Sequence, residues 1–441
     1  MKNPEERHYR IVCPLCGRRQ EDDGLTLTCA SDHEPALLHT EYREKEFRPR
    51  PEADGIFRYA DWLPVVRSFP QAGRTVVFHS ESLSAFLDMP GLRIAFNGYW
   101  PERGAFLETC TFKELEAYTV LGRLPEEPVA LVVASAGNTA AAFASVCSRY
   151  AKPCLLIVPE GGRARLKLRE PLHPAVRLVV MDGADYSDAI ALSEAVAKLP
   201  GFLLEGGVRN VGRRDGLGTV MYAAMEEAGE LPEYYFQAVG SAAGAIAVHE
   251  AAKRIQRAVP AEGDRPLPRL MLSQNASFAP LQQAWHSGRR ALVPAERDRR
   301  AIESAYADEL TNRFPPYAVH SGVHDVLTES RGDVLTVDKS SALAARQKVL
   351  DLESIDLEPA AAVATASLFA AVREGRVPRD ASVLLNLTGG GRGRLARDHV
   401  LHQVEPDLRI AAGALLDDAL ERIRELFATD LCRQSATQAN R

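Results

Sequence analysis

The chain has few cysteines and no long hydrophobic run. Its 441 residues contain seven cysteines, at positions 13, 16, 29, 110, 147, 154 and 432. An odd number at uneven spacing argues against a disulfide framework and favours a reducing compartment. No apolar stretch is long enough for a signal peptide or a membrane span. We therefore expect a cytoplasmic protein that makes no contact with a membrane.

An excess of charge of one sign is also missing. The net formal charge is -6, and no basic run dominates any segment, so the sequence offers no electrostatic surface for nucleic acid. With 46% hydrophobic and 25% charged residues, the chain can bury a large core, which excludes a disordered protein and predicts two or more domains. These features are typical of a metabolic protein that acts on small molecules.

Apolar runs of strand length alternate with stretches of helical spacing. Nearly continuous runs indicate strands that are buried on both faces, as in parallel sheets. Helical spacing is clear at 139–150 and 187–199, which predicts an α/β fold with two mostly parallel sheets. The predicted strands lie at 129–133, 154–158, 176–181, 234–239, 269–273 and 383–387.

A pair of cysteines near the start resembles one knuckle of a zinc ribbon. Cys13 and Cys16 flank two residues and are followed by a glycine, which allows the tight turn that points two thiolates at one ion. Cys29 follows at a suitable distance, but a second Cys-x-x-Cys is missing, so Asp32 or His33 would have to complete a tetrahedral site. Two interpretations stay open: a zinc site, or a ribbon-shaped module that has lost its metal and is held by packing.

Three small-residue loops follow predicted strands, where ligands bind in open α/β sheets. The loop Ser135, Ala136, Gly137, Asn138 and Thr139 opens an Ala-rich helix whose N–H groups suit a carboxylate. The loop Gly240, Ser241, Ala242, Ala243 and Gly244 also opens a helix, and its small side chains let the backbone approach a phosphate. At the third, Thr388 precedes three glycines, and its hydroxyl is suited to meet a ring nitrogen. Taken singly, each is also explained as a helix cap or a tight turn.

Lys113 is the candidate nucleophile. It begins a predicted helix and follows Phe112 in a segment with few other charges. A desolvated amine can become nucleophilic near neutral pH, and a lysine with a phosphate loop is what a Schiff base with pyridoxal phosphate requires. A solvated lysine at a helix start is the alternative if the loops lie elsewhere.

Most of the chain resembles the fold-type-II pyridoxal phosphate enzymes of the threonine synthase group, and within it most closely the archaeal-type cysteate synthases. The shared fold is like that of the tryptophan synthase β-chain. The segments that carry the resemblance are the cysteine knuckle, 111–117, 134–139, Asn210 with 213–216, 275–280, 355–361 and 386–391.

The resemblance implies roles for individual residues. Lys113 would form the Schiff base beside Phe112, and Asn138 would meet the 3′-oxygen of the cofactor. The loop 240–244 would bind the cofactor phosphate, and Thr388 would face the pyridine nitrogen. The substrate carboxylate would be bound by Ser135, Ala136, Gly137 and Thr139. Arginines beside these loops are candidates for binding phosphate or sulfite, namely Arg213, Arg214, Arg392 and Arg394.

The implied reaction is a β-replacement. O-phospho-L-serine would lose phosphate, sulfite would add at the β-carbon, and the product would be L-cysteate, a precursor suited to coenzyme M or another sulfonate. Threonine synthases commonly have Asp after the lysine and Asn in the phosphate loop, whereas this chain has Glu114 and ends the loop in Ala-Gly. Threonine synthesis from O-phosphohomoserine, β-replacement with another nucleophile and a catalytically inactive homologue remain alternatives.

The resemblance also predicts the division of the chain. A zinc-ribbon-like module would occupy 1–47, and a large cofactor domain 48–94 with 230–430. A small mobile domain at 95–229 would bind the substrate carboxylate, with the active site between the two domains and a frayed tail at 431–441. A homodimer or a higher homo-oligomer is expected.

Overall fold

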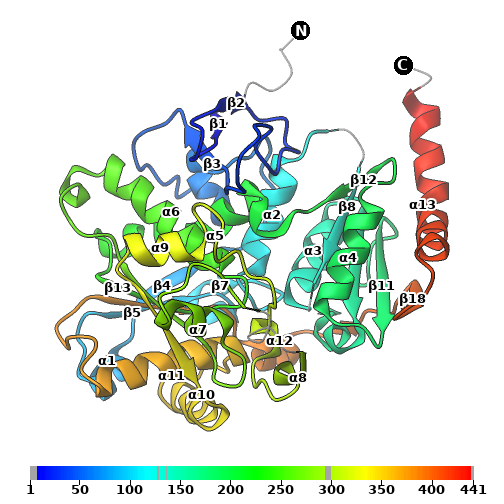
Figure 1. Ribbon diagram of the computed structural model, residues 1–441. Coiled ribbons are helices and arrows are strands. Elements are labelled where there is room, and N and C mark those ends of the chain that lie inside the picture. Colours follow the sequence, from blue (N-terminus) through cyan, green and yellow to red (C-terminus); the bar gives the residue numbers. More distant parts are fainter. Residues whose placement is uncertain (1–6, 127–128, 136, 294–298, 439–441) are drawn as a thin grey trace. The chain divides into compact units, whose positions relative to one another are not determined.

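The computed structural model describes residues 7–126, 129–135, 137–293 and 299–438. They form two compact units, one built from the described residues up to 123 and from 207 to 397, and the other from those between 124 and 206 and from 398 onwards. Each unit contains its own sheet and its own hydrophobic core (Figure 1). We describe the units separately.

A six-stranded sheet forms the centre of the first unit, in the order β15-β14-β13-β16-β5-β4. All neighbours are parallel except β4 and β5. Every side chain of β16 is buried, which agrees with its mostly apolar sequence, broken only by Asn386. The strands are β4 (Val76–His79), β5 (Leu92–Phe96), β13 (Tyr234–Ala238), β14 (Arg269–Asn275), β15 (Asp333–Val337) and β16 (Val383–Leu387), and a small hairpin joins β6 (Tyr99–Trp100) to β7 (Ala105–Phe106).

Helices cover both faces of this sheet. In Figure 1, α10 and α11 lie below the sheet, while α2, α5 and α6 lie above it, where α5 packs on both α2 and α6. The helices are α1 (Glu81–Leu87), α2 (Lys113–Arg123), α5 (Val211–Ala228), α6 (Ala243–Ala258), α7 (Pro280–His286), α8 (Arg299–Ile302), α9 (Val323–Glu329), α10 (Lys339–Glu353), α11 (Pro359–Arg373) and α12 (Arg392–Asp398).

The N-terminal module is an antiparallel three-stranded sheet in the order β2-β1-β3. Its strands are β1 (Tyr9–Val12), β2 (Arg19–Glu21) and β3 (His39–Tyr42). It lies against the helical layer of the first unit, where Thr40 and Tyr42 donate hydrogen bonds to Asp215 of α5.

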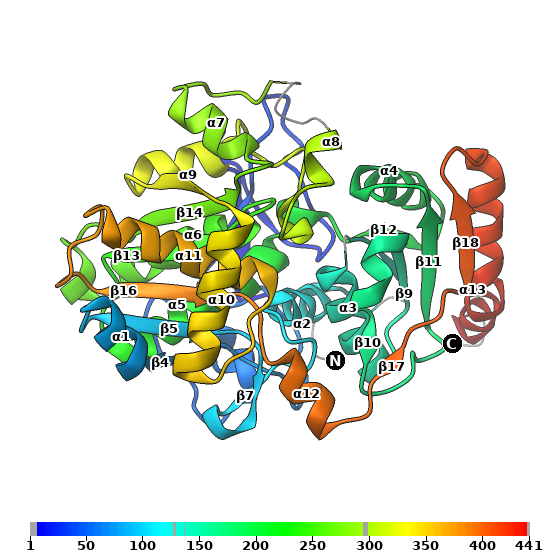
Figure 2. The same ribbon diagram turned by 90° about the horizontal axis from the view of Figure 1, so that it is seen from below.

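The second unit is a five-stranded parallel sheet in the order β12-β8-β9-β11-β18. Figure 2 shows α13 beside β18, and their apolar residues share a core with β8, β9 and α4. The elements are β8 (Ala130–Ala134), α3 (Asn138–Arg149), β9 (Cys154–Pro159), β11 (Val176–Asp182), α4 (Tyr186–Val196), β12 (Phe202–Leu204), β18 (Leu408–Ala411) and α13 (Leu416–Gln438), with a short pair of β10 (Lys167–Leu168) and β17 (His402–Gln403).

All six predicted strands and the helices predicted at 139–150 and 187–199 are present in the structure. The compact units differ from the predicted domain ranges. Residues 95–123 and 207–229 belong to the first unit because α2 and α5 pack against each other and α5 also packs on β4 and β5. Residues 398–441 belong to the second unit because β18 pairs with β11. Helix α13 continues to Gln438, into the range of the predicted tail.

Candidate functional site

The segment that carries Lys113 is joined to the loop that carries Thr388. The backbone N–H of Phe112 donates to the carbonyl of Thr388 at 3.0 Å, and that of Gly390 donates to the carbonyl of Cys110 at 3.0 Å. Helix α2 begins at Lys113, as predicted. The structure thus brings together two of the predicted cofactor-binding segments, which are far apart in the sequence.

The loop 240–244, predicted to bind a phosphate, lies beside Phe112. A Cβ added to Gly244 would come within 2.9 Å of the Phe112 ring and 2.8 Å of the Gln237 amide nitrogen. Ala242 has a left-handed backbone (φ 59°), which turns the chain into α6, and the Ser241 hydroxyl accepts the N–H of Ala243, the first residue of that helix, at 3.4 Å. The N-terminus of a 16-residue helix, a position that suits an anion, therefore lies beside Phe112.

Lys113 has a buried carboxylate beside it. Its Nζ lies 3.4 Å from Oε2 of Glu116. The other oxygen of this carboxylate, Oε1, forms an ion pair with Arg213 at 2.9 Å. Glu116 is fully buried, while Lys113 keeps some solvent exposure. A buried acidic side chain needs polar or cationic partners, and Glu116 has two, Lys113 and Arg213. The sequence analysis assigned no role to Glu116, although it lies one helical turn after Lys113.

Buried polar side chains form a hydrogen-bonded network next to the loop 240–244. Tyr235 donates to Gln237 at 2.6 Å, Asn386 donates to Tyr235 at 2.6 Å, and Asn97 donates to Asn386 at 2.8 Å. Burial raises the pKa of Tyr235, so its hydroxyl stays protonated and serves as a donor. These hydrogen-bonded side chains were not predicted, although polar residues within otherwise apolar strands are the sequence signal for such a network.

The predicted arginines have different surroundings. Arg214 is buried, pairs with Glu250 at 3.1 Å and donates to the carbonyls of Leu38 and Val208. These contacts connect α5 with α6 and the N-terminal module. Arg392 donates to Glu358 at 2.6 Å, and Arg394 donates to Glu102 at 2.8 Å. Arg213 shares a partner with Lys113, because both contact the carboxylate of Glu116.

The loop predicted to bind a carboxylate lies in the second unit, between β8 and α3. The Ser135 hydroxyl accepts the N–H groups of Gly137 and Ala140, each at 3.0 Å, and so fixes the loop. Gly137 has φ 137°, a conformation that favours glycine. Among the described residues, no hydrogen-bond partner meets the buried Oδ1 of Asn138. Thr139 is buried at the start of α3, and Ala136 lies outside the described residues.

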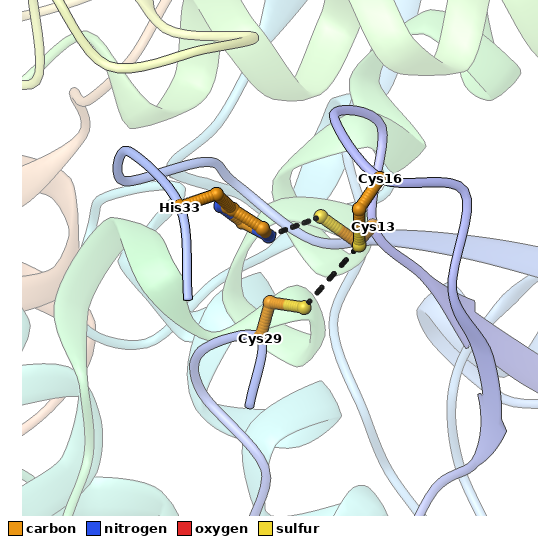
Figure 3. A group of neighbouring side chains, drawn as sticks. All are labelled: Cys13, Cys16, Cys29 and His33. Carbon is orange, nitrogen blue, oxygen red and sulfur yellow. Dashed lines mark hydrogen bonds between the residues drawn. The ribbon is translucent and has the colours of Figure 1, made fainter. Parts of the chain in front are cut away.

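Four potential metal ligands of the N-terminal module face one another (Figure 3). The ligand atoms of Cys13, Cys16, Cys29 and His33 all lie within 4.8 Å of one another. Asp32, the other predicted candidate, is not part of this group. His33 is therefore the fourth member of the cluster.

A family model described as "Pyridoxal-phosphate dependent enzyme" matches residues 71–389. The chain belongs to this family. Among curated proteins it is similar to the cysteate synthase of Methanosarcina barkeri, with 44% identity over 90% of this chain and 96% of the relative. The cysteate synthase of Methanoculleus marisnigri is 44% identical over 95% of this chain and 97% of the relative.

Two solved structures show a similar fold. Maize serine racemase matches with a TM-score of 0.55 and 18% identity, covering 74% of this chain and 91% of that one. The serine racemase of Dictyostelium discoideum matches with a TM-score of 0.52 and 16% identity, covering 72% and 92%. The predicted fold-type-II architecture is thus confirmed.

The residues of the first unit fit the family's cofactor. They supply an amine at Lys113, a helix N-terminus for a phosphate and an aromatic ring near both, with the Nζ of Lys113 5.0 Å from the ring centre of Phe112. The cofactor is pyridoxal phosphate, as predicted. Among the helices in the described part of the chain, none combines the length and the apolar character needed to cross a membrane.

Proposed function

We propose that the protein is a cysteate synthase, which replaces the phosphate of O-phospho-L-serine with sulfite and releases L-cysteate. The observation that carries this proposal is 39–44% identity with eight cysteate synthases over nearly their whole lengths. The convergence of Lys113, Phe112 and the loop 240–244 supplies the machinery that such chemistry needs.

Lys113 is the proton carrier in this proposal. Pyridoxal phosphate, when bound, withdraws electrons from the α-carbon of an amino acid and makes its proton acidic. The Nζ of Lys113 would take that proton as phosphate leaves from the β-carbon. Glu116 would hold the amine in position after it is released, because its carboxylate already lies 3.4 Å away.

The loops would bind the anionic groups. The N-terminus of α6 would hold the cofactor phosphate. The hydroxyl of Thr388 would form a hydrogen bond with the pyridine nitrogen, and such a partner limits the build-up of negative charge on the ring. The loop 135–139 would bind the substrate carboxylate through the N-terminal amides of α3, and Asn138 would meet the 3′-oxygen. Arg213 is the arginine that we place near the reacting groups, through Glu116.

The test compares amino-acid substrates directly. Purified protein loaded with pyridoxal phosphate is given O-phospho-L-serine or O-phosphohomoserine, each with and without sulfite, and phosphate release is followed. The proposal expects sulfite-dependent release from phosphoserine alone. Threonine from O-phosphohomoserine would instead identify a threonine synthase, and pyruvate without a sulfonate would point to another nucleophile. A protein that forms no coloured complex with the cofactor would be an inactive homologue.

The expectations of a homo-oligomer and of a cytoplasmic location belong to the same proposal. Light scattering of the purified protein would show a mass of at least twice 48.2 kDa if the chain forms a homodimer. A monomeric mass at the protein concentration of the assay would contradict this part of the proposal.

A further inference from the structure

We propose that Cys13, Cys16, Cys29 and His33 bind one zinc ion, and that this ion holds the loop between Cys16 and Cys29 against the end of the lysine-bearing helix α2. The proposal concerns the N-terminal module and goes beyond the proposed reaction. It rests on the geometry of the four ligands and on the contacts made by the loop that they close.

The spacing of the ligand atoms is that of a tetrahedral zinc site. Zinc bonds of about 2.3 Å to sulfur and about 2.0 Å to nitrogen place two sulfurs about 3.8 Å apart, and a sulfur and a nitrogen about 3.5 Å apart. Cys16 and Cys29 have their sulfurs 3.7 Å apart, and the sulfur of Cys13 lies 3.3 Å from Nε2 of His33. Three thiolates with one imidazole select zinc over harder cations.

The backbone around the ligands fixes their directions. The N–H of Gly17 donates to the carbonyl of Cys13 at 3.0 Å, and Gly17 has φ 72°, so the first knuckle is a tight turn that requires glycine. The Nδ1 of His33 lies 2.6 Å from the carbonyl of Glu34. This contact assigns the ring proton to Nδ1 and leaves Nε2 to face the sulfurs, as in zinc-bound histidines (Figure 3).

The loop between the ligands carries the second part of the inference. Asp22 and Thr26 lie in this loop, and both contact Arg123, the last residue of α2. The guanidinium of Arg123 forms two hydrogen bonds to Asp22, at 2.9 and 2.8 Å, and one to the carbonyl of Thr26 at 2.7 Å. Arg123 and Asp22 are both fully buried. Separating them would leave buried charges without partners, which destabilises the folded state.

Arg123 also connects two helices. Its Nη1 donates to Oδ1 of Asn210 at 3.0 Å, and the same oxygen accepts the N–H of Gly212 as the cap of α5. Helix α2 starts at Lys113 and α5 carries Arg213, the two partners of Glu116. An ion that closes a loop of 13 positions thus restrains the Asp22 carboxylate that fixes both helices.

Metal content tests whether the four ligands bind zinc. The full-length protein, purified without added metal, is analysed by plasma mass spectrometry, and we expect close to one zinc per chain. Cys29→Ser and His33→Ala should each lose most of the zinc. Asp32→Ala is the matched control and should keep it, because Asp32 is exposed and outside the cluster. Zinc well below one per chain, or zinc retained in Cys29→Ser and His33→Ala together, would overturn the site.

A second measurement guards against variants that fail to fold. Wild-type protein whose zinc is exchanged for cobalt(II) should show the visible bands of tetrahedral thiolate coordination, and added zinc should abolish them. Octahedral cobalt spectra, or no spectrum at all, would contradict the ligand set.

Hydrogen exchange tests the coupling to α2. Removing zinc with a chelator should raise exchange of the backbone amides at the end of α2, residues 118–123, by about tenfold or more, while β8 and β9 of the second unit stay unchanged. Asp22→Asn should raise exchange at the same residues and keep its zinc. Removal of zinc with no change at 118–123 would show that the ion does not restrain this helix.

Discussion

At the scale of single residues, Lys113 carries the account. Lys113→Ala should abolish the visible absorption band of the bound cofactor, because the variant lacks the amine that would form the Schiff base. Lys339→Ala is a matched control, since Lys339 is also the first residue of a helix and is exposed. The control should keep the band and full activity. An absorption spectrum that is unchanged in Lys113→Ala would contradict the assignment.

Glu116 is the residue that the structure adds to the site. Glu116→Gln should lower kcat more than it changes KM, because the carboxylate positions the amine of Lys113 and does not bind substrate in this account. The change also removes a buried partner of Arg213, so we expect a loss of about 3 kcal/mol in the free energy of unfolding. Steady-state kinetics and urea unfolding measure the two effects. A variant with normal kcat would remove Glu116 from the mechanism.

Sequence reasoning singled out Lys113, Phe112 and Thr388 because they belong to local motifs that follow strands or begin a helix, and the family resemblance supplied the roles predicted for them. It missed Glu116 and the pair of Asp22 with Arg123, since a buried ion pair leaves no local pattern. It also grouped Arg214 with the substrate-binding arginines, because sequence proximity does not reveal that α5 carries Arg213 and Arg214 toward different partners.

At the scale of helices and strands, close packing of α5 on α2 supports the site. A Cβ at Gly216 would lie 2.4 Å from the Thr119 hydroxyl and 2.6 Å from the carbonyl of Leu115. Gly216→Ala should therefore destabilise the first unit by about 1–3 kcal/mol, because the helices must separate. Thermal unfolding measures this. Gly161→Ala, where a Cβ meets nothing within 4 Å, is the control, and equal effects of the two changes would contradict the packing argument.

Glu250 on α6 makes the stability of the first unit depend on pH. Burial alone would raise the pKa of Glu250, but Arg214 and His39 lower it from 4.5 to about 2. A depressed pKa stabilises the folded state above the unfolded-state value, and this contribution disappears as the pH falls toward 2. The shift corresponds to a contribution on the order of 3 kcal/mol at neutral pH. Comparing urea unfolding of wild type and Glu250→Gln, we expect a gap in stability that narrows from pH 7 to pH 3; a constant gap would contradict the ionised pair.

The strands were predictable because buried parallel strands are nearly continuous apolar runs, such as β8 and β9. The short strands of the N-terminal module and β18 gave no such signal. In β18 only one of four residues is buried, so a helical or loop assignment fits its sequence equally well.

At the scale of the whole molecule, the chain crosses between its two units three times. Sequence alone placed the boundaries at 95 and 229, whereas the compact units divide at 123, 206 and 397. The pairing of β18 with β11 joins segments more than 200 residues apart, and such long-range pairing cannot be deduced from local composition.

The function is a property of the whole molecule, and one measurement tests it most directly. Protein loaded with pyridoxal phosphate is incubated with O-phospho-L-serine and isotope-labelled sulfite, and the amino-acid product is identified by mass spectrometry. The account predicts labelled L-cysteate, formed together with phosphate and absent from Lys113→Ala. Turnover of phosphoserine that leaves the sulfur label only in sulfite would contradict the claim that this protein makes cysteate.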